Sequence, residues 1–526
     1  METARKNLLL SQQARLLMPS DDLFTLVKSL TPAEKRYFKL FAQTHASGEA
    51  TNYLLLFEAM DKQTEYDEEA IKKKYRKEKF VAQLTFTRNA LRNKILDALC
   101  AYIGGSKDNT IVFEFRQALN HLLALYRKGI YGQMEKDLKR LLKMAADYEM
   151  PIYTLELLQW QRRLLLERTD RNITEDLDAL IEEEQRAQQL LQNEAQFKHL
   201  HDRLLVSLKV RIRAKDAEAL QKMEELIQIP LLQAENNALT RQAKLFYNEI
   251  WGFYHWRMGN FASMYAHHKR IIEIWETNDL FRNEHRHEYR KALCNFLNSC
   301  HAFQKFEDYP PTLVKIRALA ANDVPTEVKI FHISFYHELL YYLNTFSIAK
   351  GVAEIPERLP QLEAWKDQIH SSRLLTIYYN IALVYFFAHR FGDALTWINE
   401  ILSHPKADTR REVYHTAHIL QLAIHYELGN IDLLENLHRS VYRNLKNADE
   451  LQLFERLLLS NFKKLATVNE YDKKAMRSYF ESFDKELKEQ LSEFPQKHLL
   501  GWFEIQTWLS SKLNGMTMSE VLIQNK

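Results

Sequence analysis

One two-helix pattern recurs along this chain, and it constrains the fold more than any other feature of the sequence. Its best copy runs from Tyr378 to Ile401. A first helix sets aromatic and aliphatic residues around the small Ala382, and a second helix returns with Ala394 and further apolar residues three and four positions apart. The pattern predicts a tight corner between the two helices at residues 391–393, around Gly392.

Lower-fidelity copies of this pattern fill most of the chain. Three of them place a glycine at the corner, at Gly129, Gly259 and Gly429. Weaker hairpins are expected around Gln159, Ser207, Asn298 and Leu339 and over residues 454–487. Successive copies are roughly 37 to 48 residues apart, which is the range of helical repeat architectures.

The recurring order is an aromatic residue, a small residue about eight positions before the corner, a second aromatic residue, and then alanine with apolar residues. This order resembles the tetratricopeptide repeat (TPR), although a standard TPR has a shorter period of about 34 residues. The resemblance implies an all-α, TPR-like solenoid of helical hairpins, wound as a right-handed superhelix. Its expected role is that of a non-catalytic scaffold that binds a protein or peptide on the concave face.

The composition agrees with long helices and short connections. Glycine and proline together supply 23 of 526 residues, or about 4%, where an average chain carries roughly 12%. Folds rich in strands and turns need glycine at left-handed backbone positions, so they are disfavoured. Length alone predicts three to four domains. A stack of hairpins does not need separate domains, because each hairpin buries its apolar face against its neighbours.

Three regions are predicted: a basic helical module over 1–107, a repeat solenoid over 111–492, and a capping helix with a tail over 493–526. Thr31, Pro32 and Glu34 form a strong helix start in the module. The segment 104–109 is the clearest linker. The module resembles the N-terminal segments of repeat proteins from Bacteroidetes-type bacteria. A last helix over 497–513 is suited to cap the stack.

The sequence predicts a cytoplasmic protein without disulfides or a membrane partner. It has three cysteines, Cys100, Cys294 and Cys300, which is no disulfide framework. The N-terminal segment has only three consecutive leucines, too few for a secretory signal. The longest apolar run, residues 374–388, is too short to span a bilayer.

No pattern for catalysis, a cofactor or a metal rises above background, so a non-enzyme without a cofactor is expected. The twenty histidines include no zinc-protease spacing, and they are expected to be solvated or to lie in hairpin cores. Glycine-rich loops that wrap phosphate groups are absent. No nucleophile lies in a recognisable catalytic signature.

The most marked local concentration of charge lies between residues 72 and 94, a segment with nine basic residues and a single acidic one, Glu78. Such a cluster neutralises phosphates in nucleic-acid complexes, although a solvated face or a surface for an acidic protein is the more ordinary interpretation. Candidate contacts to nucleic acid or to an acidic partner are Lys72, Lys73, Lys74, Arg76, Arg88 and Arg92. A nucleic-acid-associated regulatory protein is therefore the alternative function.

The other candidate surface is aromatic. In TPR-like stacks the first helix of each hairpin lines the concave groove, and aromatic side chains there make good anchors for a peptide or a partner helix. The repeat frame places eight residues toward this groove: Phe246, Phe253, Trp256, Tyr336, Tyr379, Leu383, Phe386 and Tyr426. Packing between hairpins is the competing interpretation for each of them.

Overall fold

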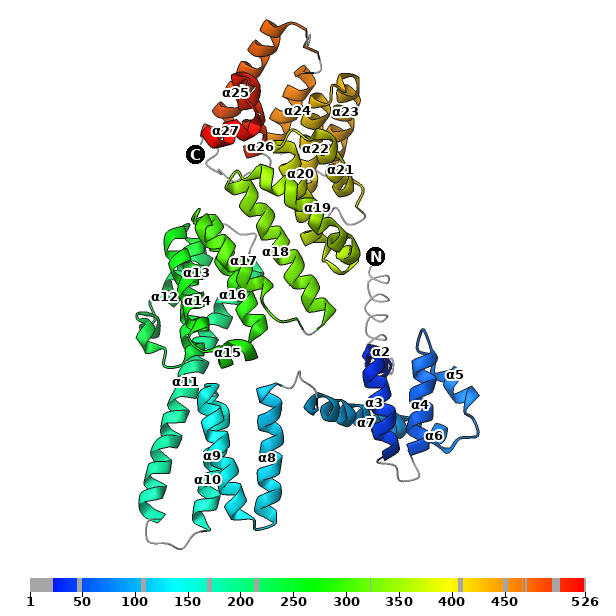
Figure 1. The fold of residues 1–526 in the computed structure, drawn as a ribbon, viewed down its shortest axis with the longest axis vertical. Coiled ribbons are helices and arrows are strands. Elements are labelled where there is room, and N and C mark those ends of the chain that lie inside the picture. Colours follow the sequence, from blue (N-terminus) through cyan, green and yellow to red (C-terminus); the bar gives the residue numbers. More distant parts are fainter. Residues whose placement is uncertain are drawn as a thin grey trace, which may run out of the picture. The chain divides into compact units, whose positions relative to one another are not determined.

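The computed structural model describes residues 22–44, 50–105, 110–167, 173–211, 217–321, 323–404, 410–447, 453–465, 467–468, 471–493 and 502–524. Over these residues the chain forms 26 α-helices and no strand, as the all-α prediction requires (Figure 1). None of the helices in this described part combines the length and the hydropathy that a membrane crossing needs.

The chain divides into two compact units. The first comprises Met1–Ala146 and Ile152–Glu184, and the second comprises Asp147–Pro151 and Gln185–Lys526. The predicted module over 1–107 lies within the first unit, and residues 106–109 of the predicted linker lie outside the described residues. The predicted boundary at 492 falls in the last turn of a helix of the second unit.

The first unit begins with six helices around a core of their own. They are α2 (Asp22–Ser29), α3 (Pro32–Thr44), α4 (Ala50–Lys62), α5 (Glu68–Lys74), α6 (Lys79–Ala82) and α7 (Leu84–Gly104). Phe38, Phe57 and Leu91 are buried in this core. The predicted capping box is confirmed, because the Thr31 backbone N–H donates to Glu34 Oε2 at 2.7 Å and the Glu34 N–H donates to Thr31 Oγ1 at 3.3 Å.

The rest of the first unit consists of α8 (Ile111–Arg127), α9 (Tyr131–Asp147), α10 (Pro151–Leu166) and the first part of α11 (Ile173–Arg211). The sequence predicted two separate hairpins, around Gln159 and around Ser207. This prediction is wrong about the connection between them, because α11 continues without a turn for 39 residues. Neither glycine nor proline occurs between residues 173 and 211, so nothing in that segment breaks a helix.

The second unit is a succession of packed helices. After the end of α11 they are α12 (Ala217–Ile227), α13 (Arg241–Arg257), α14 (Phe261–Glu276), α15 (Asp279–Glu284), α16 (Arg286–Ala302), α17 (Tyr309–Arg317), α18 (Val324–Asn344), α19 (Ile348–Trp365), α20 (Ser371–Phe387), α21 (Phe391–Leu402), α22 (Arg411–Glu427), α23 (Ile431–Asn447), α24 (Leu453–Leu465), α25 (Lys473–Glu493), α26 (Trp502–Asn514) and α27 (Met518–Gln524). From α16 onward each long helix packs against the next one in the chain. Helices α18, α20, α22 and α24 also pack against one another in sequence.

The corners between paired helices share one backbone geometry. A residue in the left-handed region follows the first helix of each pair, at positions 259, 304, 346, 389 and 429, which are 45, 42, 43 and 40 residues apart. The next N–H donates to the carbonyl five residues back, as in Asn260 to His255 at 2.9 Å and Asn430 to His425 at 3.0 Å. This bond is the Schellman motif that ends a helix. Gly129 of the first unit makes the same corner.

The corner predicted around Gly392 is displaced by three residues. The left-handed residue is His389, with φ of 58°, and Gly392 already lies in the first turn of α21. The Arg390 N–H donates to the Tyr385 carbonyl at 2.9 Å, so the motif is complete without glycine. A histidine is tolerated there although a left-handed conformation costs an L-residue about 1–2 kcal/mol. The prediction from Gly392 was therefore right about the helical hairpin but wrong about which residues form its turn.

Candidate functional site

The candidate surface lies on the first helix of each pair in the second unit. We call the helices α13, α16, α18, α20, α22 and α24 the A helices, and the surface that carries the predicted aromatic residues the A face. Small residues permit close packing behind it: Ala382 is fully buried in α20, and a Cβ built on Gly252 of α13 would lie 3.0 Å from His268 Nε2. The A helices are thus held in a fixed order by their partners.

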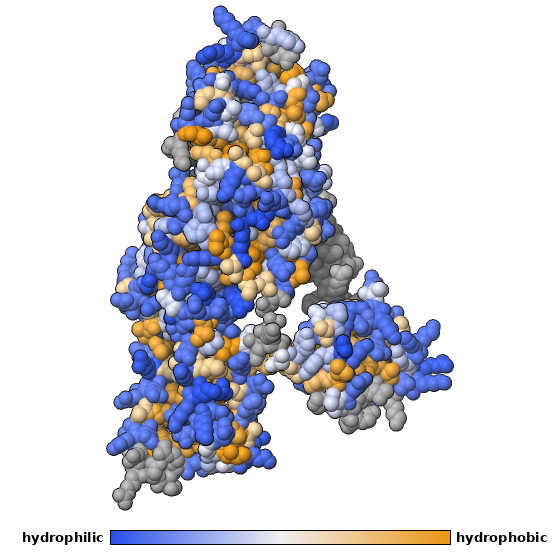
Figure 2. Space-filling view, in the orientation of Figure 1, coloured by the Kyte–Doolittle hydropathy of each residue, from blue (hydrophilic) through white to orange (hydrophobic). Residues whose placement is uncertain are grey.

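The A face begins with an aromatic group on α13 that is open to solvent. The rings of Phe253 and Trp256 are 5.1 Å apart, and 47% of Trp256 is exposed. Phe246 is half-buried, and its ring lies 5.1 Å from that of His201 on α11. Figure 2 shows other hydrophobic residues in small groups among hydrophilic ones on the visible face of this unit. Of the predicted anchors, Trp256 is the most exposed.

Histidines pack behind this aromatic group. The ring of His267 stacks on those of Trp251 and His255, at 6.2 and 5.5 Å, and its Nδ1 lies 2.9 Å from Asn248 Oδ1. Burial is the main cause that lowers the pKa of His267 and of His268 to about 4, and at His267 the neighbouring histidines contribute a smaller part of this shift. Both rings are therefore neutral near pH 7 and support the aromatic surface as hairpin-core residues.

Tyr336 on α18 is half-buried, and a cation covers it. The Arg373 guanidinium of α20 lies 4.3 Å from the centre of the Tyr336 ring, which is a cation–π contact. Tyr336 therefore supports an arginine on the A face.

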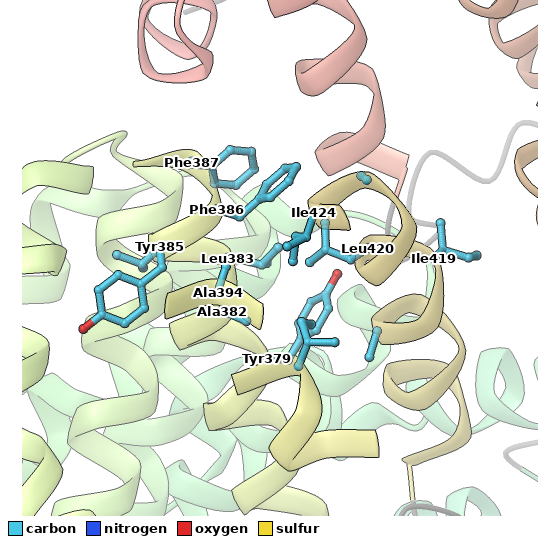
Figure 3. Packing of buried hydrophobic residues seen from close by; sticks show 14 of the residues in the cluster. Tyr379, Ala382, Leu383, Tyr385, Phe386, Phe387, Ala394, Ile419, Leu420 and Ile424 are labelled. Atoms are coloured by element: carbon cyan, nitrogen blue, oxygen red, sulfur yellow. The ribbon is translucent and has the colours of Figure 1, made fainter. Parts of the chain in front are cut away.

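The aromatic residues of α20 lie inside the core. Tyr379 and Phe386 are 2% and 0% exposed, and Leu383 is also buried. Figure 3 shows Leu383 beside Leu420 and Ile424 of α22, whereas Tyr385 lies on the other side of α20. Tyr379, Leu383 and Phe386 therefore pack between helices of the chain, which is the competing interpretation that the sequence allowed.

Helix α26, the last but one in the described order, covers this part of the A face. The Tyr379 hydroxyl donates to Glu504 Oε1 at 3.0 Å, and burial raises the pKa of Tyr379 well above its ordinary value. The Trp508 ring lies 5.9 Å from that of Tyr426, and its Nε1–H donates to Glu427 Oε1 at 2.6 Å. Helix α26 thus lies across the A helices.

Helix α27 extends this cover to a corner of the stack. The Met518 N–H donates to His389 Nε2 at 3.0 Å, and the Ser519 hydroxyl donates to the Phe387 carbonyl at 3.0 Å. The sequence predicted a helix that caps the end of the stack, and it missed these contacts to α20. Trp508 was the available signal, but its hydrogen-bond partner Glu427 is 81 residues away in the chain.

The basic segment of the first unit is partly neutralised. Glu68 accepts Lys72 at 2.9 Å and Arg88 at 2.9 Å, and Lys72 also pairs with Glu69 at 2.8 Å. The hydrogen bond from Lys72, with smaller effects of Tyr66 and Arg88, lowers the pKa of Glu68 against its burial. The sequence window began at Lys72 and so excluded both acids.

The other candidate cations of this segment face solvent. Lys73, Lys74, Arg76 and Arg92 are exposed, and no ion pair involves them within the described ranges. Arg88 and Arg92 do not act together as an i, i+4 pair, because Arg88 is turned toward Glu68 and the Tyr66 ring. The exposed cations therefore come mostly from α5 and the turn after it.

The structure also forms a pocket in the first unit that sequence reasoning did not find. Leu138, Leu164 and Leu180 from α9, α10 and α11 line it, together with acidic side chains such as Glu135 and Glu183. The three cysteines are free thiols. Among the described residues, no three His, Cys, Asp or Glu side chains converge as metal ligands would.

Comparison with protein-family models, with curated proteins and with solved structures finds no match to this chain.

Proposed function

We propose that this chain is a TPR-like helical-repeat protein that acts without catalysis and binds a helix of a protein partner on the A face of its second unit. The recurring corners support the repeat assignment, because five of them fall 40 to 45 residues apart with the same Schellman bond. Hairpins that repeat in this way stack through their first and second helices.

The observation that carries the proposal is that helix α26 of the chain itself already lies on the A face. Tyr426 is three residues before the corner at Gly429, and it contacts Trp508 of α26. Trp256 holds the same register position, three residues before Gly259. There the aromatic ring is 47% exposed. The same register position is thus occupied by Tyr426, which contacts α26, and by Trp256, which is exposed to solvent.

The chemistry of this contact defines the expected partner. Helix α26 presents a tryptophan and a lysine, and both interact with Glu427 at the end of α22. An amphipathic helix with an aromatic anchor would bury Phe253 and Trp256 in the same way, and aromatic residues with few rotors give large contact area at low entropic cost. The open part of the A face on α13 is the proposed docking surface.

The test is affinity purification from the native host with the full chain as bait. The expected result is a stoichiometric protein partner that is lost with the Phe253→Ala, Trp256→Ala double variant. Losses of about 2 kcal/mol or more per anchor are usual when buried aromatic residues are truncated. Hydrogen exchange should show protection of α13 in the complex.

Tyr442→Ala is the matched control. Tyr442 is 43% exposed on α23, which is not an A helix, so its truncation should leave the partner bound. A partner that survives the double variant, or one that Tyr442→Ala also releases, would contradict the assignment to α13.

The exposed cations of the first unit favour nucleic acid as the second candidate. Arg76→Glu with Arg92→Glu should abolish a mobility shift whose affinity falls steeply with salt. A shift that these charge reversals leave intact would exclude this surface. Since Glu68 neutralises part of the segment, we regard the protein partner as the better supported function.

A further inference from the structure

The pocket of the first unit has an apolar wall. Helices α9, α10 and the start of α11, labelled in Figure 1, enclose a cavity of about 410 Å³. Cavities of this size bind small organic molecules in other proteins. Its apolar wall consists of five leucines, Leu138, Leu142, Leu164, Leu165 and Leu180, and all but Leu142 are buried. An aliphatic group that replaces water against these leucines would be bound by the hydrophobic effect.

The rim of the pocket is acidic. The lining contains four carboxylates and one ammonium group, which leaves a net charge of −3, and they belong to Glu135, Glu167, Asp176, Glu183 and Lys139. All five side chains are exposed, whereas the leucines are mostly buried. The pocket therefore combines an apolar interior with negative charge around it. Like charges beside an apolar surface repel one another more strongly than in bulk water.

The structure of the chain accounts for two of these carboxylates. Glu135 forms an ion pair with Lys139, and its Oε1 lies 2.9 Å from the lysine Nζ. Asp176 lies in the first turn of α11, where the free N–H groups of the helix favour a negative charge. Neither contact involves the other two carboxylates.

Glu167 and Glu183 form no ion pair within the residues that the structure describes. Glu167 directly follows α10, at the end of the helix where a carboxylate is unfavourable. Its Oε1 accepts the neutral Tyr126 hydroxyl at 3.0 Å. Glu183 lies inside α11, away from the helix ends. A cation in the pocket would offset both charges.

Two arginines on the last turns of α10 do not line the pocket. The Arg162 Nε donates to Glu184 Oε1 at 3.1 Å. The Arg163 guanidinium lies 4.5 Å from the centre of the Trp160 ring. Lys139 is therefore the one cation of the lining, which leaves the pocket with its negative charge.

Gln161 gives a second, independent indication of the ligand. This half-buried residue lines the pocket, and its Oε1 is buried without a hydrogen-bond partner in the described part of the chain. A buried acceptor without a donor lowers stability. A ligand that carries N–H groups would supply the donor.

We propose that this pocket binds a small organic cation, an ammonium group on an aliphatic chain. The chain covers the leucines, and the ammonium group lies among the rim carboxylates, where its N–H groups donate hydrogen bonds. The net charge of −3 repels anions, and a neutral ligand would leave that charge uncompensated. The pocket belongs to the first unit, so its ligand is independent of the partner proposed for the second.

The experiment is isothermal titration calorimetry of the full chain with hexylammonium chloride, at neutral pH and at constant ionic strength set with sodium chloride. Hexylammonium should bind, and butylammonium should bind about ten-fold more weakly because two fewer methylene groups are buried. Hexanol lacks the charge and ammonium chloride lacks the chain, so each should bind at least about ten-fold more weakly than hexylammonium. Equal affinities for hexylammonium and hexanol, or no saturable binding of hexylammonium, would overturn the proposal.

Hydrogen exchange locates the bound cation. Hexylammonium should slow exchange in α9, α10 and the start of α11, because a ligand that binds only the folded state stabilises it. Protection confined to other helices would overturn the assignment to this pocket.

Glu183→Gln separates binding from folding. The side chain is exposed and forms no ion pair within the described ranges, so the variant should unfold at the temperature of the parent. Its affinity for hexylammonium should fall about ten-fold, since a charge-assisted contact is lost. Glu182→Gln is the matched control, because this exposed neighbour on α11 lies outside the lining and its change gives the same net charge. Unchanged affinity in Glu183→Gln, or an equal loss in Glu182→Gln, would contradict the assignment.

A diamine of the same chain length distinguishes two kinds of ligand. Hexane-1,6-diammonium that binds more tightly than hexylammonium would support a diamine, with each ammonium group beside a rim carboxylate. Weaker binding would support a monoamine whose free chain end lies among the leucines.

Discussion

The two units solve the problem of burying helices in different ways. Among the described residues of the first unit, the buried side chains are apolar except for Thr87. The second unit buries charged and polar groups at many places, including Arg290, His337, Glu338 and Glu504. Of the twenty histidines, only His45 and His121 belong to the first unit.

This difference changes what each unit needs in order to remain folded. An apolar core needs only matching shapes, whereas a buried polar group must find a partner or lower stability. Helix α26 supplies one such partner, because Glu504 Oε1 accepts the buried Tyr379 hydroxyl at 3.0 Å. The described core of the first unit is therefore held by apolar packing, whereas that of the second unit also depends on polar contacts in its interior.

Of the substitutions considered, Trp508→Ala should cause the largest loss of folding stability. This loss should be limited to the second unit. Trp508 is fully buried, stacks on Phe462 at 5.7 Å and donates to Glu427. Truncation of such a residue costs about 3–5 kcal/mol. Hydrogen exchange followed by mass spectrometry should show faster exchange in α20, α22 and α24 and unchanged exchange in the first unit.

Phe57→Ala provides the reciprocal variant. Phe57 is fully buried in the core of the first unit, so its truncation should accelerate exchange in α3, α4 and α7 only. If either variant destabilised both units equally, the two cores would be one cooperative structure and the comparison would fail.

Acid should destabilise the second unit first. Burial lowers the pKa of His332 and His418 to about 4 and that of His337 to about 3, against an ordinary value of 6.5. The unfolded chain then binds more protons than the folded one, so stability falls as the pH drops below about 6.5 and continues to fall down to the folded pKa values. Each unit of pKa difference corresponds to about 1.4 kcal/mol.

Hydrogen exchange at pH 7.5, 6 and 5 tests this prediction, after correction for the intrinsic rate at each pH. His337→Leu should reduce the acid sensitivity of the second unit, because one site of proton uptake is removed. Equal loss of protection in the first unit over pH 6.5 to 5 would show that buried histidines are not the cause.

Sequence periodicity could predict the helices and hairpins because these depend on local patterns. The capping box at Thr31 and the corners at Gly129, Gly259 and Gly429 follow from residues adjacent in the chain. The cover of Tyr379 by α26 could not be predicted, because Glu504 is 125 residues away. The neutralised basic segment was within reach, since Glu68 is only four residues before Lys72.

Substitution of the glycine at a helix corner should cost the same folding stability in both units. Gly129 and Gly259 have φ of 68° and 70°, and a Cβ at either position would meet nothing within 4 Å. Alanine at each position should therefore cost only the backbone penalty, about 1 kcal/mol, in its own unit. Denaturant unfolding monitored by exchange measures both values. Clearly different costs would show that the corners are not equivalent.

The reverse substitution, Gln304→Gly, should stabilise the second unit. Gln304 is exposed and has φ of 59°, so glycine removes a left-handed strain of about 1 kcal/mol. The greater freedom of glycine in the unfolded chain offsets part of this gain. The same unfolding measurement should show a small increase, and a loss of stability would contradict the account of the shared corner.

The smallest effect is expected from Glu68→Gln in the first unit. The ion pairs with Lys72 and Arg88 are partly exposed, so their loss should cost about 0.5 kcal/mol and less at high salt. The pKa of Glu68 is lowered, so its contribution is present above the ordinary value of 4.5 and is lost as the pH falls through the folded pKa. This acid transition lies below that of the histidines in the second unit. Glu69→Gln, which removes a more exposed carboxylate that pairs with Lys72, is the control and should leave unfolding unchanged. A Glu68→Gln loss that persists in high salt would indicate packing of Arg88 on Tyr66 rather than charge as its origin.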